Sequence, residues 1–310
     1  MEEKFRPVVI TGPTGVGKTE LGIQIAKRLN GEIISVDSRQ IYRLMDIGTA
    51  KPTLQQREQV VHHLINICNP NEIYTAGRFS RDVRLLISGL QKQKIRPILV
   101  GGSGMYFSAI IDGLFSSGLP NDDVRTELSG RLEKEGLSSL YNELETVDPI
   151  SHARLSPNDT PRILRALEVA IGTPVNQTTH FRNQANTALQ QMPLMFVVSR
   201  NRNMLYQRID SRVDTMISQG WVQEIEQLLE LGYPSNCVGL SSLGYNQLIC
   251  HIEQGSDIDS EISEIKQRTR RYAKRQITWL RKDRRLRWLD IDHLSIHGVA
   301  ERIIAQVIAQ

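Results

Sequence analysis

The pattern with the clearest chemistry is a glycine-rich segment near the N-terminus. It matches the phosphate-binding pattern G-x-x-x-x-G-K-[ST] and lies between an apolar run and a helical pattern. Its glycines let several backbone N–H groups converge on one anion, and the following helix adds the positive end of its dipole. We predict that Lys18 reaches a terminal phosphate and that the Thr19 hydroxyl binds Mg²⁺. The residues of this phosphate loop are Gly12, Pro13, Thr14, Gly15, Val16, Gly17, Lys18 and Thr19.

Two further polar segments follow apolar runs. Asp37 comes directly after the run at 32–36, and a glycine-rich turn containing Ser103 comes after the run at 96–101. Because the carboxyl ends of strands in an open α/β sheet form the ligand crevice, both segments are expected beside the phosphate loop. Asp37 could there be a general base, a magnesium ligand or a ribose contact. Its structural alternative is an ordinary loop or N-cap residue.

Three other patterns give weaker indications. The turn-rich segment 46–52 is expected near the same edge of the sheet. Arg162 and Arg165 lie three residues apart on one helix face, where they could clamp phosphates or equally be surface residues. His62 and His63 are adjacent, so their side chains point to different faces and do not predict one metal site.

A strongly basic segment lies near the end of the chain. Residues 266–287 include eleven Lys or Arg residues and one acid, Asp283, with Tyr272, Trp279 and Trp288 in or next to the run. The whole chain has a net charge of only +4, so this charge is concentrated. A nearly single-sign run repels itself, which favours a polyanionic partner such as nucleic acid over the alternative of a solvated helix face.

The elements that must position these residues follow from the alternation of apolar runs with helical patterns. Short runs rich in Ile and Val predict buried parallel strands, and helical patterns between them predict a doubly wound α/β fold. The predicted strands are 7–11, 32–36, 64–67, 96–101, 195–199 and 287–291, and the predicted helices include 18–29, 78–93, 105–114 and the long amphipathic region 203–231.

The predicted organisation is a P-loop NTPase-like core, with helices flanking the parallel sheet, and an inserted helical subdomain. The core comprises 1–115 and 193–310 and ends in basic helices, whereas the insertion at 116–192 is polar and interrupted by prolines. Three cysteines without a C-x-x-C pair predict a cytoplasmic protein without a disulfide framework or zinc site. Glu2 and Glu3 and the lack of a long apolar run at the start of the sequence predict no signal peptide. No apolar run of about 18 residues occurs, so no membrane segment is expected.

Seven segments together resemble the bacterial tRNA dimethylallyltransferases, the tRNA isopentenyltransferase or IPP transferase family. The resemblance runs from about residue 6 to about residue 290, and the blocks that begin at Asp37 and Arg270 are far more specific than the phosphate loop. The segments are GPTGVGKT (12–19), ISVDSRQIY (34–42), MDIGTAKP (45–52), LVGGSGMY (99–106), NDTPRILRALEV (158–169), SLGYNQ (242–247) and QRTRRYAKRQITWLR (267–281).

The resemblance implies transfer of the dimethylallyl group from dimethylallyl diphosphate to N6 of an adenosine in tRNA. The implied target is the adenosine 3′-adjacent to the anticodon (tRNA position 37) in tRNAs reading codons that begin with U. The loop would hold the diphosphate rather than ATP. Lys18 and Mg²⁺ would neutralise the leaving charge, and Asp37 would take the amine proton. Where the family usually has Thr after its double glycine, this chain has Ser103, which keeps the hydroxyl.

The resemblance also assigns residues by position. Thr14, Lys18, Asp37 and Arg125 are implied in catalysis. The implied tRNA contacts are Asp37, Ser38, Arg39, Gln40, Ser103, Arg125, Pro161, Arg162, Ile163, Leu164, Arg165, Ser242, Leu243, Gly244, Tyr245, Asn246, Gln247, Lys274, Arg275, Gln276, Ile277, Thr278, Trp279, Leu280 and Arg281. The expected protein is a monomer that binds tRNA and dimethylallyl diphosphate, with no membrane and no obligate protein partner.

Two alternative functions share part of this pattern. An ATP-dependent P-loop kinase of small molecules or nucleotides would use Asp37 to bind magnesium or activate an acceptor hydroxyl. It would need neither the basic, aromatic-bearing segment nor the inserted subdomain. A non-enzymatic RNA-binding module would not need Asp37 beside an intact phosphate loop.

Overall fold

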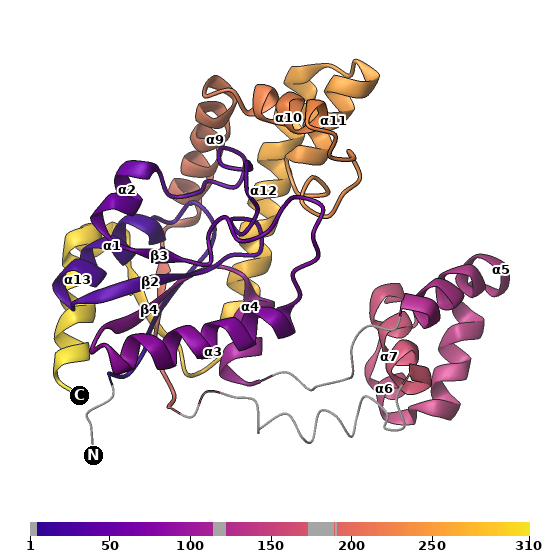
Figure 1. Cartoon of the computed structure of the whole chain (residues 1–310), viewed down its shortest axis with the longest axis horizontal. Helices are drawn as coiled ribbons and strands as arrows, with labels where there is room; N and C mark the ends of the chain where they lie inside the picture. Colours follow the sequence, from indigo (N-terminus) through magenta and orange to yellow (C-terminus); the bar gives the residue numbers. More distant parts are fainter. Residues whose placement is uncertain (1–4, 114–121, 173–188, 190) are drawn as a thin grey trace. The chain divides into compact units, whose positions relative to one another are not determined.

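The computed structural model describes residues 5–113, 122–172, 189 and 191–310 (Figure 1). The chain forms two compact units, residues 1–107 with 190–310 and residues 108–189, and each is described by itself. The sequence prediction placed the two boundaries at 115/116 and 192/193 instead. In the described ranges, none of the helices has the length and apolar character needed to cross a membrane.

The first unit is built on a parallel sheet of six strands among the described residues. Strand β1 lies inside the sheet, between β4 and β5, in the order β3-β2-β4-β1-β5-β6. Since every strand runs the same way, the loops that follow β1, β2, β4 and β5 all leave from one edge. The strands are β1 (Val8–Thr11), β2 (Gly31–Val36), β3 (His62–His63), β4 (Arg96–Gly101), β5 (Leu194–Ser199) and β6 (Arg287–Asp290).

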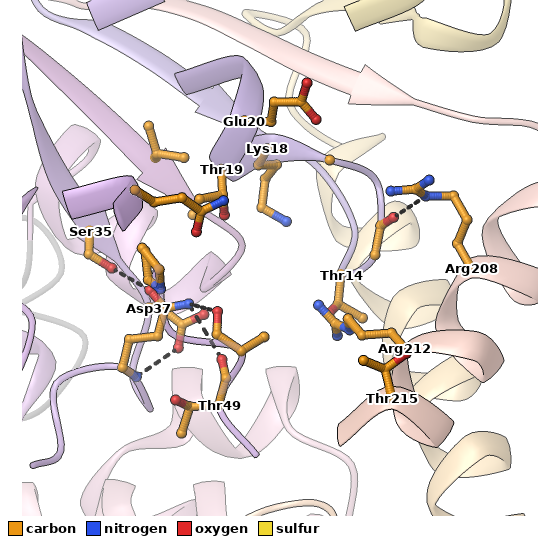
Figure 2. A pocket seen from close by; sticks show the side chains of 18 of the residues that line it. Thr14, Lys18, Thr19, Glu20, Ser35, Asp37, Thr49, Arg208, Arg212 and Thr215 are labelled. Carbon is orange, nitrogen blue, oxygen red and sulfur yellow. Dashed lines mark hydrogen bonds between the residues drawn. The ribbon is translucent and has the colours of Figure 1, made fainter. Parts of the chain in front are cut away.

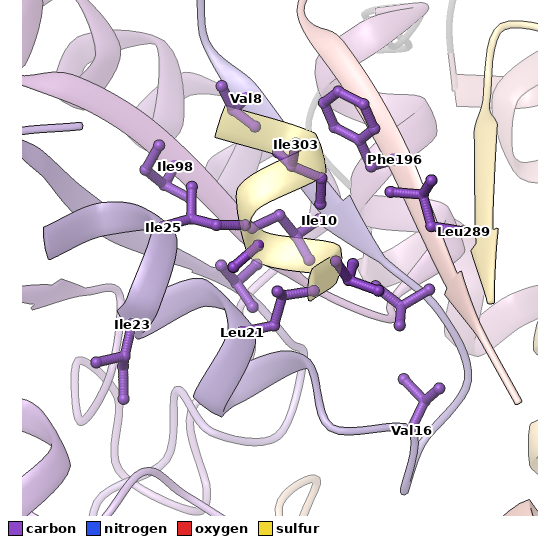
Figure 3. Packing of buried hydrophobic residues seen from close by; sticks show 14 of the residues in the cluster. Val8, Ile10, Val16, Leu21, Ile23, Ile25, Ile98, Phe196, Leu289 and Ile303 are labelled. Atoms are coloured by element: carbon purple, nitrogen blue, oxygen red, sulfur yellow. The ribbon is translucent and has the colours of Figure 1, made fainter. Parts of the chain in front are cut away.

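Helices cover the sheet and extend beyond it (Figure 1). The apolar side chains of three neighbouring strands meet α1 and α13 on one face, where Ile10, Ile98 and Phe196 pack with Leu21 and Ile303 (Figure 3). Burial of each large apolar side chain stabilises the fold by about 1.5–3 kcal/mol, so this cluster fixes β1 and α1 on either side of the phosphate loop. The described helices of the first unit are α1 (Lys18–Arg28), α2 (Leu54–Gln59), α3 (Ala76–Lys92), α9 (Arg202–Ser218), α10 (Trp221–Glu230), α11 (Tyr245–Gln254), α12 (Ile258–Leu280) and α13 (Ile291–Ile308), and α4 (Gly104–Ile111) crosses the boundary between the units.

The third strand differs from its prediction. It was expected at 64–67, but the residues that pair with β2 are His62 and His63. Leu64 has a φ of 61°, in the left-handed region, so the extended backbone ends before the apolar run that suggested a strand. The polar His-His pair carries no strand signal of its own.

The predicted helical region 203–231 is interrupted, and the basic run extends from a helix to the predicted strand at 287–291. The region 203–231 forms α9 and α10, separated at Gly220, whose φ of 96° breaks the helical backbone. The basic run does not stay helical to residue 287, because α12 ends at Leu280 and Arg287 already begins β6. Residues 281–286 therefore connect a helix to the edge strand.

The second unit is helical. It contains α5 (Asp122–Val147), which is kinked at Gly136, and then α6 (Pro149–Arg154) and α7 (Thr160–Gly172). Its own small core includes Leu128, Leu140, Leu144, Ile163 and Leu167. The Asp148 side chain caps α6 by accepting a hydrogen bond from the Ser151 N–H.

Candidate active site

The phosphate loop joins β1 to α1 as predicted, and its lysine folds back across it. Lys18 Nζ donates to the carbonyl oxygens of Gly12 at 3.0 Å and Pro13 at 2.8 Å. Burial lowers the pKa of Lys18 to about 8, with a further lowering from the Arg212 charge and an opposing effect from Asp37. A Cβ at Gly12 would lie 2.5 Å from the Val198 carbonyl oxygen, so the loop needs glycine there to leave the sheet.

Three arginines after β5 hold successive residues of the loop. The Arg212 guanidinium donates to the Thr14 hydroxyl at 2.6 Å, and Arg208 Nε donates to the Gly15 carbonyl oxygen at 3.1 Å (Figure 2). Arg200 Nε donates to the Val16 carbonyl oxygen at 3.3 Å. Arg208 and Arg212 were missed by the sequence analysis. Their four-residue spacing, which places them on one face of a helix, was the available signal.

Asp37 lies at the carboxyl end of β2, at the same edge of the sheet. Its Oδ1 accepts hydrogen bonds from the Arg39 N–H at 2.8 Å and the Gln40 N–H at 3.4 Å. Asp37 therefore stabilises its own loop, as the structural alternative proposed, but only through Oδ1. Within the described part of the chain, Oδ2 accepts no hydrogen bond, so it is available as a proton acceptor.

Gln40 connects Asp37 to the turn-rich segment 46–52. Its amide oxygen accepts a hydrogen bond from the Ser35 hydroxyl at 3.1 Å, and its amide nitrogen donates to the carbonyl oxygen of Ala50 at 3.1 Å. It also donates to the Thr49 carbonyl oxygen at 3.4 Å. The implied tRNA contact Gln40 thus fixes the wall of the cavity beside Asp37.

A buried carboxylate on α10 holds the other end of that segment. Glu224 accepts hydrogen bonds from the N–H groups of Asp46 and Ile47, each at 2.7 Å, and of Gly48 at 3.2 Å. The Tyr245 hydroxyl donates to the same carboxylate at 2.7 Å. Sequence analysis missed Glu224 because it lies in an ordinary amphipathic helix, some 180 residues from the segment that it organises.

Two cavities meet at Asp37. One, of about 690 Å³, is lined by the phosphate loop and the α9 arginines (Figure 2). The other, of about 310 Å³, has walls that combine apolar and aromatic side chains with polar ones such as Arg39, Thr269 and Arg275. The walls of the second cavity include Met216, Trp221, Ile265 and Tyr272. The residues that line both cavities are Thr14, Asp37, Thr49 and Arg212. The Asp37 carboxylate therefore lies between a cavity lined by Lys18, Arg208 and Arg212 and a cavity with aromatic side chains in its walls.

Thr19, which was predicted to bind Mg²⁺, lines the larger cavity, and its hydroxyl makes no hydrogen bond to any described residue. The described residues contain no cluster of three or more His, Cys, Asp or Glu side chains that could hold a metal. Mg²⁺ bound here would take most of its ligands from phosphate oxygens and water, which is its usual mode in phosphate sites.

The glycine-rich turn after β4 lies beside Asp37, as predicted. The Ser103 hydroxyl accepts a hydrogen bond from the Ser38 N–H at 3.2 Å. The methyl group that Thr would carry is not needed for this contact. Ser103 thereby links the ends of β2 and β4.

The implied tRNA-contact segments divide into outward and inward side chains. Arg162, Asn246, Lys274, Arg275, Thr278 and Arg281 are exposed. The following residues are buried, and their side chains pack or cap within the structure, although Ser242 and Tyr245 also line the smaller cavity; the tRNA contact implied for all of them stays a prediction. They are Ile163, Ser242, Tyr245, Gln247, Gln276 and Leu280. Gln247, for example, accepts a hydrogen bond from the Gly244 N–H at the start of α11.

Several cations of the basic run are neutralised by acidic side chains in the folded protein. Lys266 and Arg270 form ion pairs with Asp214 and Asp210 of α9, at 2.5 and 2.6 Å. Arg268 pairs with Glu264 and Arg285 pairs with Asp283. The charges without an ion pair to any described residue include Lys274, Arg275, Arg281, Lys282 and Arg284. The first part of the run therefore anchors α12 to α9, and the charges that remain for a polyanionic partner lie toward its end.

Within the second unit, two arginines that the resemblance assigns to tRNA binding lie beside the same carboxylate. Arg125 and Arg165 lie 3.4 and 2.8 Å from the Glu168 carboxylate. Arg162 pairs with Asp159. The catalytic role implied for Arg125 stays a prediction.

Comparisons with known proteins agree with this geometry. A family model described as IPP transferase matches residues 40–283, which is well over half of the chain. The chain belongs to the IPP transferase family. The family match begins after the phosphate loop and Asp37, so it was found independently of both. The P-loop NTPase-like fold predicted from the sequence is confirmed by the parallel sheet and by the solved structures of this family.

Relatives extend the likeness over the full chain. A tRNA dimethylallyltransferase of Geobacter metallireducens is 41% identical, over 93% of this chain and 94% of that protein. One of Natranaerobius thermophilus is 38% identical over 99% of this chain and 93% of its own length. The full-length tRNA isopentenylpyrophosphate transferase of Bacillus halodurans superposes with a TM-score of 0.71 at 34% identity, covering 99% of this chain and 98% of that one. A eukaryotic dimethylallyltransferase acting on tRNA gives a TM-score of 0.83 at 30% identity, covering 96% and 77%.

Proposed function

We propose that this protein transfers the dimethylallyl group of dimethylallyl diphosphate to N6 of the adenosine 3′-adjacent to the anticodon (tRNA position 37), in tRNAs that read codons beginning with U. The observation that carries the proposal is the position of Asp37, at the junction of the phosphate-loop cavity and the aromatic-walled cavity. The relatives support the same reaction, because proteins named tRNA dimethylallyltransferase match nearly the whole chain.

The junction suits the electronic demands of the transfer. The exocyclic amine of adenine is a poor nucleophile because its lone pair is delocalised into the ring, so the donor must leave readily. As the bond from N6 to the allylic carbon forms, the bond from that carbon to the diphosphate oxygen breaks, and the N6 proton moves to the Asp37 carboxylate. Lys18 and Arg212 supply positive charge where the leaving oxygens gain negative charge.

Mg²⁺ fits this reaction as a further source of charge. Bound to the diphosphate, it would neutralise part of the leaving charge, and Thr19 is the residue proposed to hold it. Lys18 and Arg212 then orient the donor, and the apolar walls around Met216 and Ile265 would exclude water from the junction once both substrates fill the cavities. Exclusion of water protects the cation-like allyl group from hydrolysis.

tRNA is proposed to bind along α12 with the target base turned into the smaller cavity. Bases of a single-stranded loop are cheap to unstack, and aromatic walls such as Tyr272 and Trp221 suit a flat ring. The exposed charges of Lys274, Arg275 and Arg281 would neutralise backbone phosphates. We further propose a cytoplasmic monomer that needs no protein partner.

A transfer assay tests the proposal. The protein is incubated with labelled dimethylallyl diphosphate, Mg²⁺ and an unmodified tRNA that reads codons beginning with U, and ATP hydrolysis is followed in parallel. A matched tRNA with guanosine in place of the target adenosine is the control. We expect label in the first tRNA alone, with no ATP turnover. ATP consumption without labelled tRNA would instead establish the kinase alternative, which the family relationship does not support.

A further inference from the structure

Gln276 lies in the middle of the segment implied to contact tRNA, yet its side chain points inward. It is only 8% exposed. Its amide oxygen accepts a hydrogen bond from the Thr14 N–H at 2.9 Å, and its amide nitrogen donates to the Gly102 carbonyl oxygen at 2.9 Å. One side-chain amide thus joins helix α12 to the phosphate loop and to the turn after β4.

The neighbouring backbone leaves room for this contact. A Cβ at Gly102 would lie 2.5 Å from Gln276 Nε2, and a Cβ at Gly104 would lie 2.8 Å from the Trp279 ring. A side chain at Gly104 would therefore collide with the Trp279 ring, and one at Gly102 would displace the Gln276 amide. The two backbone partners also fix the amide orientation, since one can only donate and the other can only accept.

Thr14 connects this amide to the proposed chemistry. The same residue accepts the Arg212 hydrogen bond through its hydroxyl and lines both cavities. Gln276 therefore fixes the backbone of a residue whose side chain holds an arginine of the anion site. The basic helix itself is anchored to α9 by the Arg270–Asp210 ion pair, so both helices and the loop form one framework.

We infer that Gln276 is a positioning residue for the diphosphate donor and not a tRNA contact. This inference rests on the proposed function and assigns Gln276 to the opposite substrate from the one that the resemblance implied. Its amide holds the phosphate loop at a fixed distance from α12, so that the leaving diphosphate and the tRNA-binding helix keep one relative placement. Small displacements of reacting groups reduce rates strongly, by about 100-fold for roughly 1 Å.

The inference is tested by comparing Gln276→Leu with Gln267→Leu. Gln267 lies on the same helix, is exposed and makes no hydrogen bond to the described residues, so it is a matched control for the substitution. We expect Gln276→Leu to reduce kcat/KM for the donor about 10- to 100-fold, while the dissociation constant for tRNA changes less than about twofold. The control should leave both unchanged. A weaker tRNA affinity with an unaltered donor kcat/KM would overturn the inference, and so would no change in either.

A second pair of variants separates positioning from general loss of structure. Gly102→Ala displaces the same amide from the other side, so it should reproduce the donor defect. Combined with Gln276→Leu, it should add little, because both changes break one bridge. Gln276→Glu keeps the acceptor for the Thr14 N–H, loses the donor to Gly102 and adds a negative charge beside the anion site. Its donor defect should therefore exceed that of Gln276→Leu, and full additivity or an equal defect in tRNA binding would contradict the inference.

The binding of inorganic diphosphate, measured by calorimetry, tests the role of Gln276 separately from the proposed function. Gln276→Leu should weaken this binding relative to wild type, whatever the prenyl acceptor proves to be. If wild type failed to transfer label to tRNA, the proposed function would be wrong, whereas unchanged diphosphate affinity in the variant would refute the role of Gln276 alone.

Discussion

The Arg212 guanidinium donates a 2.6 Å hydrogen bond to the Thr14 hydroxyl, which joins helix α9 to the phosphate loop. Arg212 and Lys18 are close enough that the Arg212 charge lowers the pKa of Lys18. Burial likewise lowers the pKa of Arg212, and the Asp37 carboxylate opposes that effect. Two cations pressed together in a partly buried site are favourably placed to receive an anion, which would relieve their repulsion.

Replacement of Arg212 should affect the donor more than the tRNA. Arg212→Lys keeps the positive charge but loses the planar fork that bonds Thr14 while facing the cavity. We expect kcat/KM for dimethylallyl diphosphate to fall about 10- to 100-fold, and further for Arg212→Ala. Steady-state kinetics in both substrates measure this split. A defect confined to the kcat/KM for tRNA would contradict the assignment of Arg212 to the anion site.

Donor use should depend on the charge of Lys18. Because its pKa is lowered to about 8 in the free protein, the ammonium is present below that pH and is lost above it. The kcat/KM for the donor should therefore decline by up to about tenfold per pH unit above the pKa. A Lys18→Arg variant should lack this inflection in whatever activity it keeps. An inflection that persists near pH 8 in that variant would assign it to another group.

The lowered pKa of Lys18 also predicts how stability depends on pH, and the direction is opposite to that of donor use. Between about pH 8 and the unfolded value of 10.5, the unfolded chain binds more protons at Lys18 than the folded chain does. The contribution of Lys18 to the free energy of unfolding therefore rises with pH over this interval. Denaturant titrations at pH 7.5 and 9.5, compared between wild type and Lys18→Met, check the sign. Loss of donor use above pH 8 is thus not expected to reflect unfolding through this group.

Glu224 should be important for stability and for the shape of the cavity. Glu224→Ala leaves three backbone N–H groups of segment 46–48 without their acceptor, a cost of about 1–3 kcal/mol in all if water enters the site. We expect the melting temperature to fall by about 2–10 °C. The control is Glu226→Ala, an exposed glutamate on the same helix that makes no ion pair with the described residues. Equal melting temperatures for the two variants would contradict the proposed role.

The exposed charges at the end of α12 should govern the salt dependence of tRNA binding. Lys274→Glu removes a cation that has no ion pair within the described residues. The slope of log K against log salt should become shallower by about one for each phosphate that the protein no longer neutralises. Lys92→Glu on α3 reverses an exposed charge that lies outside the basic run. If both variants changed the slope equally, the effect would follow net charge and not a docking surface.

The sequence predicted the parts of the molecule that depend on local pattern. The strand, phosphate loop and helix at 8–28 are contiguous in the chain, so spacing alone revealed them. β3 was misplaced because two polar histidines form it and a left-handed Leu64 ends it. Arg212 and Glu224 were missed because they reach the site only after the chain has folded over long separations. The inward direction of the Gln276 side chain could not be predicted, because a motif does not state which side of a helix its residues face.

The most direct test of the account is an Asp37→Asn substitution followed by single-turnover transfer. Asparagine keeps the side-chain oxygen that accepts the Arg39 N–H, so the local turn is preserved while the basic oxygen is lost. The account predicts a transfer rate reduced by about 100- to 10,000-fold, with tRNA and diphosphate affinities changed less than about twofold. A transfer rate within about tenfold of wild type, or a parallel loss of binding, would show that Asp37 is not the base at the junction of the two cavities.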